Sequence, residues 1–137
     1  MPVEFLYHEE GGFLEVILLG AFALEDVIDA LGVMVNSNEW PPNVDVLWDG
    51  RMASVDHIDR AFLEDLAIFR SNIDLLRRQS RAAVVFSAKA ERVSAQLPKL
   101  FAEKYLSSEV RVFHDRDEAI RWLRGGKTSS RRSIEGR

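Results

Sequence analysis

Apolar and polar residues alternate over residues 3–8, which is the pattern of a half-buried β-strand. Residues 9–12 read EEGG and supply a turn, and residues 13–19 form a mostly apolar run that predicts a second strand. Because only a short turn separates the two strands, we expect them to pair as an antiparallel hairpin.

Further β-prone runs alternate with segments in which apolar residues recur at helical spacing. The strands are expected at 44–48, 82–86 and 110–113. The helices are expected after Phe22, from Ile58 to Leu76, after Ser87, and from Arg116 to Arg124. Within the third helix, Pro98 removes a hydrogen bond and predicts a kink or a break near Gln96 and Leu97. Asp115 is expected to cap the last helix, and Gly125-Gly126 to end it.

The predicted order is therefore ββαβαβαβα. Consecutive β-α-β units with short connections predict parallel strands joined by right-handed crossovers. We expect an α/β fold with a mostly parallel five-stranded sheet and four helices, in which the first strand is an antiparallel edge. A chain of 137 residues fits one domain, placed at residues 1–125.

The alternation along each strand assigns side chains to the two faces of the sheet. One face is apolar, with Leu14, Val16, Leu18, Val44, Val46, Trp48, Val110 and Val112. The other face mixes charge with apolar groups, since it also receives Glu15 and Asp45. We expect helices to cover this second face only in part, leaving an interface for a partner protein or a second copy. The interface candidates are Ile17, Leu19, Leu47, Arg111 and Phe113.

The segment 49–59 leads from the strand at 44–48 into the long helix, and Asp49-Gly50 is interpreted as a turn signal. Ligands in open α/β sheets tend to bind at such carboxyl ends of strands, beside helix N-termini. Ser54 and Asp56 are both expected to cap the helix. An arginine here can bind a carboxylate or phosphate, although a salt bridge to Asp49 or Asp56 is the simpler role. The candidates for binding a ligand or partner are Asp49, Arg51, Ser54, Asp56 and His57.

The same segment allows a catalytic interpretation, with His57 as a base oriented by Asp56 or Asp59 and Ser54 as a nucleophile. A solvated first helical turn with a capping serine explains these residues better, and no Gly-x-Ser-x-Gly elbow surrounds the serine. The three histidines lie on separate predicted elements without ligand spacing. We expect no enzymatic activity, no metal and no cofactor.

Composition and charge exclude several classes of protein. The chain has no cysteine, so it has no disulfide framework and no thiolate chemistry. The N-terminus lacks the features of a signal peptide, and no apolar run approaches the roughly 20 residues of a membrane span. We expect a cytoplasmic protein with no integral membrane segment.

The net charge of −4 is unevenly distributed. Residues 124–137 hold five basic residues and one acid, which makes this segment +4 and the rest of the chain −8. An acidic domain repels phosphate backbones, so nucleic-acid binding is not expected. Residues 126–137 are interpreted as a flexible basic tail, and the final IEGR is similar to the site of the processing protease factor Xa, which suggests a vector-derived segment as an alternative to a native one.

Two segments carry a resemblance to a known family: EVRVFHDRDEAIRWL at 109–123 and VLWDGR at 46–51. With the predicted element order, they resemble STAS-type domains related to the sporulation anti-anti-sigma factor, in the bacterial SpoIIAA-like (STAS/SEC14-like) branch. The resemblance spans roughly residues 3–124. It implies a small α/β domain that binds a partner regulator, sometimes under control of serine phosphorylation, or that holds lipid as SEC14-type relatives do.

The chain departs from the phosphorylated relatives at the start of the long helix. Where those relatives carry an Asp-Ser-Ser/Thr-Gly run, this chain reads ASVDHID at 53–59, and Ser54 is its only hydroxyl. We therefore do not expect Ser54 to be phosphorylated. The resulting hypothesis is a non-enzymatic STAS-like module for protein interaction, and the alternative is a carrier of a small amphipathic or lipid-like ligand held between sheet and helices.

Overall fold

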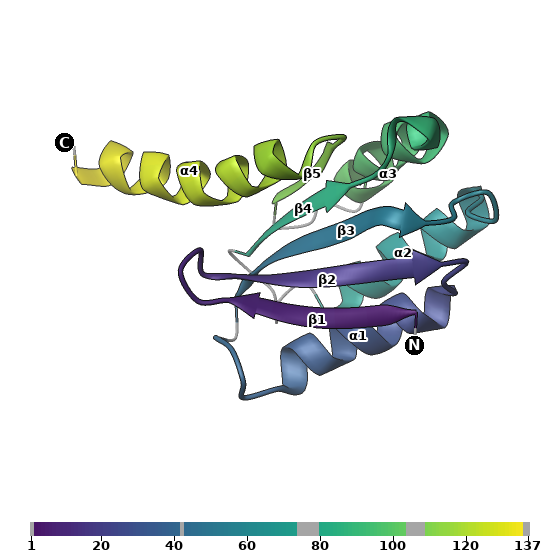
Figure 1. Ribbon diagram of the computed structural model, residues 1–137, viewed down its shortest axis with the longest axis horizontal. Helices are drawn as coiled ribbons and strands as arrows, with labels where there is room; N and C mark the ends of the chain where they lie inside the picture. Colours follow the sequence, from purple (N-terminus) through teal and green to yellow (C-terminus); the bar gives the residue numbers. More distant parts are fainter. Residues whose placement is uncertain (1, 42, 74–79, 104–108, 136–137) are drawn as a thin grey trace.

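A mixed β-sheet with helices on both faces forms the domain in the computed structural model, which describes residues 2–41, 43–73, 80–103 and 109–135 (Figure 1). Its elements are β1 (Val3–His8), β2 (Phe13–Gly20), α1 (Leu24–Asn36), β3 (Asp45–Ala53), α2 (Arg60–Asn72), β4 (Arg81–Val85), the short 3₁₀ helix η2 (Ala88–Ala90), α3 (Glu91–Glu103), β5 (Glu109–Phe113) and α4 (Arg116–Glu135). The predicted order and fold class are confirmed.

The strands lie in the sheet in chain order, β1-β2-β3-β4-β5, with β1 antiparallel to β2 and the other neighbours parallel. Each parallel crossover is right-handed and advances by one strand in the same direction, so α1, α2 and α3 must share one face of the sheet. The last helix, α4, follows the final strand and packs on the opposite face (Figure 1).

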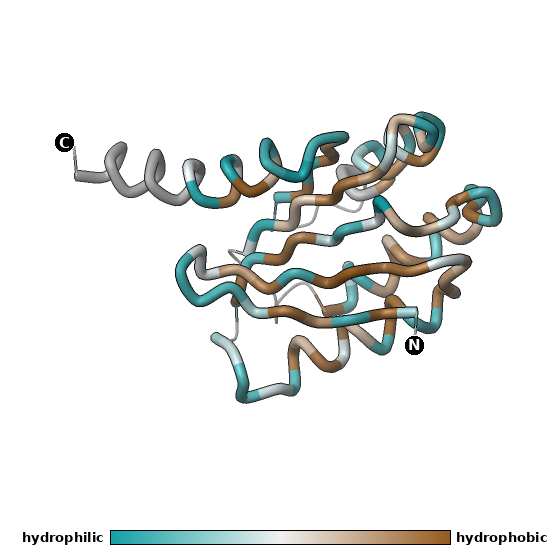
Figure 2. Tube along the Cα trace, viewed as in Figure 1, coloured by the Kyte–Doolittle hydropathy of each residue, from teal (hydrophilic) through white to brown (hydrophobic). Residues whose placement is uncertain are grey.

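The predicted assignment of side chains to faces is confirmed. The main core lies between the sheet and α1, α2 and α3, and it contains the buried strand residues Leu14, Val16, Leu18 and Val46, together with Val44 directly before β3. Figure 2 shows apolar positions along β2 and β3 interrupted by polar ones, as expected for strands whose two faces differ, whereas β4 is apolar after Arg81. Trp48, Val110 and Val112 pack at the border of this core and are partly buried.

A second apolar cluster lies beneath α4, made of Phe13, Leu47, Ala83, Val85, Ala119 and Leu123. The helix packs on β4 with further contacts to β3 and β5, so it covers only part of its face, as predicted. The prediction that Leu47 belongs to an open interface is wrong, because its side chain is 0% exposed in this cluster.

The predicted turn at Asp49-Gly50 is also wrong, since β3 continues through both residues to Ala53. A glycine is needed at position 50 because of the space around it, and not because of a turn. A Cβ at this position would lie 2.9 Å from the Phe86 ring and 3.2 Å from the carbonyl oxygen of Val85. The glycine therefore lets the neighbouring chain approach closely within the sheet.

Helix boundaries differ from the predictions for identifiable reasons. Asp59 caps α2, because its carboxylate accepts a hydrogen bond from the Phe62 amide at 2.9 Å, so the expected caps Ser54 and Asp56 are wrong. Helix α3 runs through Pro98 without the expected break. The predicted end of the long helix at Leu76 lies outside the described residues.

The last helix begins as predicted and ends later. The Asp115 carboxylate accepts a hydrogen bond from the Asp117 amide at 3.0 Å, which confirms the cap. Gly125-Gly126 does not end α4, which continues to Glu135 and extends past the sheet in Figure 1. Glycine inside a helix costs roughly 1 kcal/mol per residue, which lowers helix stability without stopping the helix.

The close approach at Gly50 generates a prediction with a matched control. Gly50→Ala is expected to lower the free energy of unfolding by about 1–3 kcal/mol, because the new methyl group overlaps Phe86 and the Val85 carbonyl. Gly32→Ala, on α1 with no atom within 4 Å of the new Cβ, is expected to be neutral or stabilising. Chemical denaturation of both variants measures this, and equal stabilities would contradict the tight contact.

Candidate functional site

The domain has two candidate sites. One is a cluster of charged residues between the sheet and the start of α4, and the other is an apolar cavity on the opposite face of the sheet. The charged group, called the ion cluster below, consists of His8, Glu15, Asp49, Arg51 and Arg116. It lies where β2 and β3 pass beside the first turn of α4.

Asp49 and Arg51 form one half of the ion cluster. Arg51 donates from Nε to Asp49 Oδ1 at 2.9 Å and from Nη2 to Oδ2 at 2.8 Å, which is the bidentate geometry of a strong pair. The Asp49 side chain is 5% exposed, and burial alone raises its pKa. The hydrogen bonds and charge of Arg51, together with a hydrogen bond to Glu15, outweigh burial, so the pKa of Asp49 lies below its ordinary value of 3.8. The expected salt bridge between Arg51 and Asp49 is confirmed.

Glu15 and Arg116 form the other half, and they are 101 residues apart in the chain. Arg116 donates from Nε to Glu15 Oε2 at 3.0 Å and from Nη2 to Oε1 at 2.7 Å. His8 Nε2 lies 2.8 Å from the same Oε1, and the Arg116 Nε lies 4.0 Å from Asp49 Oδ2. The hydrogen bonds that Arg116 donates to the Glu15 carboxylate raise the pKa of Arg116. The cluster thus links β1, β2, β3 and α4.

Sequence reasoning missed Arg116 and gave Glu15 no site role. Strand parity placed Glu15 on the mixed face, but only the position of α4 brings an arginine to it. An acid in the middle of an apolar strand was the available signal, since a buried carboxylate requires a partner.

The register of the sheet explains why Asp49 and Arg51 meet. The pairing of β2 with β3 shifts between Ile17 and Leu19, so β3 carries an extra residue there. A bulge of this kind redirects the side chains that follow it. Arg51 consequently reaches back to the Asp49 carboxylate with its side chain and with its own amide, at 3.2 Å.

The ion cluster has the properties of a structural network. Each buried carboxylate takes a bidentate arginine, which balances the charge and leaves the carboxylates engaged. Within the part of the chain that the structure describes, no group of three or more His, Cys, Asp or Glu residues could hold a metal ion.

The other members of the predicted 49–59 site lie apart from the cluster. Ser54 is exposed, and its amide donates to the Gly20 carbonyl at 2.8 Å. His57 contacts the Phe22 carbonyl through Nε2, and its ring packs edge-on against Phe22 and Phe62. The packing of His57 favours a structural role over that of a base for Ser54. Asp56 is exposed in the same turn.

The predicted sheet-face interface is divided by α4. Ile17 and Leu19 lie half-buried on β2, on the side that α4 leaves open. Phe113 on β5 packs against Trp122 of α4 with ring centroids 5.7 Å apart, and the Arg111 guanidinium lies 5.5 Å from the centre of the Phe113 ring. The five candidates therefore do not form one surface.

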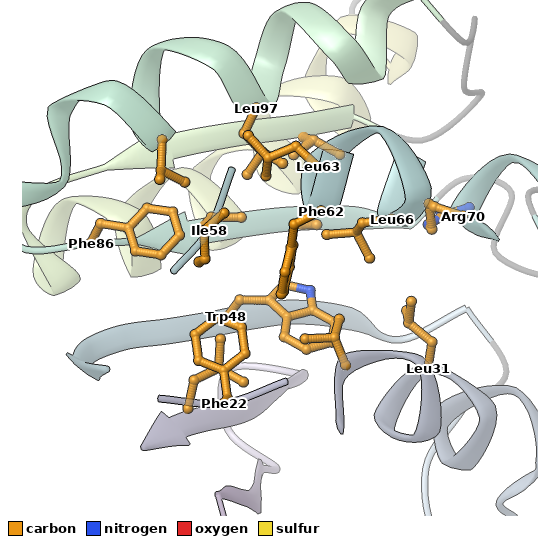
Figure 3. A pocket seen from close by; sticks show the side chains of 16 residues that line it. Phe22, Leu31, Trp48, Ile58, Phe62, Leu63, Leu66, Arg70, Phe86 and Leu97 are labelled. Carbon is orange, nitrogen blue, oxygen red and sulfur yellow. The ribbon is translucent and has the colours of Figure 1, made fainter. Parts of the chain in front are cut away.

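An apolar cavity of about 80 Å³ lies between the sheet and helices α2 and α3 (Figure 3). Its walls are aromatic and aliphatic, and the charged residue that borders it is Arg70 of α2. The lining residues are Leu18, Phe22, Val27, Leu31, Trp48, Ile58, Phe62, Leu63, Leu66, Arg70, Ala82, Val84, Phe86, Val93, Leu97 and Val110. Figure 3 shows Arg70 at one end and Phe86 at the other.

Trp48, Phe62 and Phe86 occupy inward-facing positions of the strand and helix pattern, which is typical of core packing, and the structure shows that they also line the cavity. Phe86 is buried, whereas Trp48 and Phe62 are only partly buried, so the cavity approaches the surface beside them. Helical and strand periodicity identifies inward-facing residues but cannot reveal whether they fill the space between the layers.

The fold and these two sites define a single-sheet α/β domain of the STAS type. Residues 14–124 match the family model described as SpoIIAA-like, which covers most of the chain, so the protein belongs to the SpoIIAA-like family. A crystal structure of an uncharacterized protein with a SpoIIAA-like fold from Shewanella loihica PV-4 is similar, with a TM-score of 0.55 and 15% identity over 88% of this chain and 91% of that one. At this identity the likeness shows the fold. A comparison with curated proteins finds no match.

The structure also bears on membrane association in one respect. Among the helices of the described residues, none is both long enough and apolar enough to cross a bilayer.

The ion cluster predicts a specific dependence of stability on Arg116. Arg116→Ala leaves the buried Glu15 without its bidentate partner, so the free energy of unfolding is expected to fall by about 2 kcal/mol. The matched control is Arg60→Ala, which removes an exposed pair with Glu64 at 3.7 Å and is expected to change stability by less than about 0.5 kcal/mol. Urea denaturation measures both, and an Arg116 effect no larger than the control would contradict a buried network.

Proposed function

We propose that this domain is a non-enzymatic binding module that holds a small amphipathic molecule, with the apolar part in the cavity and an anionic group beside Arg70. The observation that carries the proposal is the cavity itself, which is lined almost entirely by aromatic and aliphatic side chains and bordered by one buried cation. Ligand sites in proteins commonly combine such apolar walls with a few polar groups that fix orientation.

The size of the cavity limits the ligand. A dry cavity of roughly 150 Å³ in a protein core holds one benzene ring. The 80 Å³ here accommodates a segment of a few carbon atoms, and a longer chain requires the half-buried Phe62 or Leu66 to rotate outward. The fitting class is a short or branched aliphatic acid, or the end of a longer acyl chain.

Arg70 supplies the selectivity in this proposal. Its side chain is 7% exposed, so it lies in surroundings of low polarity where charge-assisted hydrogen bonds are strong. The residue already has an interaction within the protein. A guanidinium has five N–H donors, so Arg70 can donate hydrogen bonds to a ligand carboxylate in addition to its existing interaction.

The chemistry of the charged residues supports a role without catalysis. The carboxylates of Glu15 and Asp49 are engaged by arginines, and His57 packs against aromatic rings and the Phe22 carbonyl. These contacts position the backbone and α4, and they leave the carboxylates committed to structure.

The test is titration with hexanoate and with 1-hexanol, followed by NMR chemical shifts. Both are expected to shift the amide signals of residues around the cavity in a saturable way. Arg70→Gln is expected to weaken hexanoate about tenfold, which corresponds to about 1.4 kcal/mol, and to leave hexanol unchanged. Ala82→Leu, which fills the cavity from β4, is expected to weaken both ligands.

The control is Ile68→Ala, which shortens a side chain that is 47% exposed on α2 and does not line the cavity. Binding of both ligands should be unchanged in this variant. Absence of saturable shifts in the wild-type protein, or equal losses for hexanoate and hexanol in Arg70→Gln, would count against the proposal.

A second candidate function is binding of a partner protein through the part of the sheet face that α4 leaves open. The observation that favours it is the exposure of Met52, whose residue surface is 72% exposed on β3 opposite the half-buried Leu19. A flexible, polarizable methionine beside an aliphatic residue and the charged Arg51 is typical of adaptable protein-binding surfaces.

This candidate predicts a position-specific contact in cells. A photo-crosslinking amino acid in place of Met52 is expected to give one discrete adduct, whereas the same group in place of Ile68 is expected to give none above background. Ile68 is a suitable control because it is also an exposed aliphatic side chain, 47% exposed, but lies on α2 on the opposite face. Identical adduct patterns at the two positions would contradict a partner at the sheet face.

A further inference from the structure

The first strand presents an open edge of the sheet. Of the described strands, only β2 pairs with β1, and the pairing is regular from Val3↔Leu18 to His8↔Phe13. Natural proteins usually blunt such an edge with a bulge, an interior proline or inward-pointing charges. The register of β1 has no shift, and its sequence VEFLYH contains no proline.

The backbone groups on the open side belong to alternate residues. The Leu19 amide donates to the Pro2 carbonyl at 2.8 Å, and the Gly12 amide donates to the His8 carbonyl at 2.8 Å. Even-numbered residues of this strand therefore direct their backbone groups toward β2. By the alternation of an antiparallel ladder, the N–H and C=O groups of Val3, Phe5 and Tyr7 point toward the open edge.

Two large apolar side chains of β1 are exposed on opposite faces of the sheet. Phe5 is 38% exposed on the face of α1, α2 and α3, where its ring stacks on Trp40 at 6.0 Å. Leu6 is 51% exposed on the face of α4. A partner lying on one face would cover only one of them, whereas a strand added at the edge contacts both.

We propose that β1 pairs antiparallel with β1 of a second copy of this chain, which joins the two sheets into one. Because Val3, Phe5 and Tyr7 carry the outward backbone groups, they must pair with the same set in the other copy. This requirement permits registers in which one residue of β1 lies opposite the same residue of the other copy. The registers that pair most of the strand place Phe5 opposite Phe5 or Leu6 opposite Leu6. Both keep the α4 faces of the two copies on the same side. The arrangement is isologous and closes with two copies.

Side-chain complementarity selects the register centred on Leu6. It places Leu6 opposite Leu6 of the other copy, and Glu4 opposite His8 in both directions, so that no like charges meet. On the other face it places Phe5 opposite Tyr7, an aromatic pair of the kind that stabilises sheets. The register centred on Phe5 instead sets Leu6 against Glu4. The same complementarity favours a second copy over an unrelated strand as the occupant of the edge.

Leu6→Cys tests the register directly, because the chain has no other cysteine. In the proposed pairing Leu6 is a non-hydrogen-bonded pair with Cα atoms about 4.5 Å apart, within the range of a disulfide. Air oxidation at low protein concentration is expected to convert most of Leu6→Cys to a covalent dimer. Ile68→Cys is the control: Ile68 is exposed to a similar extent, 47% against 51% for Leu6, but lies on α2 away from β1, so random collision would crosslink both variants at similar rates.

Sedimentation of charged variants gives a second, independent measurement. Leu6→Lys and Leu6→Glu should each weaken self-association at least tenfold, because like charges then lie opposite one another. An equimolar mixture should recover the dimer, since lysine then faces glutamate. A wild-type protein that stays monomeric, a mixture that does not associate, or crosslinking no faster than for Ile68→Cys would overturn the proposal. Each result is independent of ligand binding in the cavity.

Discussion

The handedness of the β-α-β connections determines how the rest of this domain is built. Because the strands lie in chain order and every crossover is right-handed, α1, α2 and α3 must lie on the same face of the sheet. The main core forms between them and that face. Among the elements that the structure describes, α4 alone packs on the opposite face, and one helix is too narrow to cover five strands. The unequal cover leaves a half-open face, and it explains why the strands combine an apolar set of residues with a mixed one.

The ion cluster lies at the border of that incomplete cover. Glu15 and Asp49 occupy adjacent strands at the level of the first turn of α4. A buried ion pair seldom adds stability over well-packed apolar groups, but it does fix geometry. Here the bidentate pair of Arg116 with Glu15 sets the position of α4 relative to β2, and the 4.0 Å approach of Arg116 to Asp49 relates the helix to β3.

The sequence pattern predicted correctly those features that depend on local periodicity, such as which side chains of a strand face the core. The alternation in β2 correctly assigned Leu14, Val16 and Leu18 to the main core and Glu15 to the mixed face. The sequence could not reveal Arg116 as the partner of Glu15, because the two are related only through the packing of α4. Asp49-Gly50 looked like a turn because glycine there serves a close approach to Phe86, and a contact across the sheet leaves no local signal. The alternative hypothesis placed a ligand between sheet and helices on the strength of the family resemblance, whereas the residue pattern itself could not show the cavity, because periodicity gives direction and not volume.

The cavity lowers the free energy of unfolding of the domain, and the size of this effect bears on whether the cavity has a function. Empty space in a core destabilises by about 24 cal/mol per Å³, so 80 Å³ corresponds to about 2 kcal/mol. That is a substantial part of the roughly 5–15 kcal/mol by which a domain is stable. One longer aliphatic side chain among the small lining residues, such as Ala82 on β4, would fill it. A cost so easily removed, in a cavity that also borders a buried arginine, is the physical argument behind the proposed occupant, because packing alone would favour neither the space nor the charge.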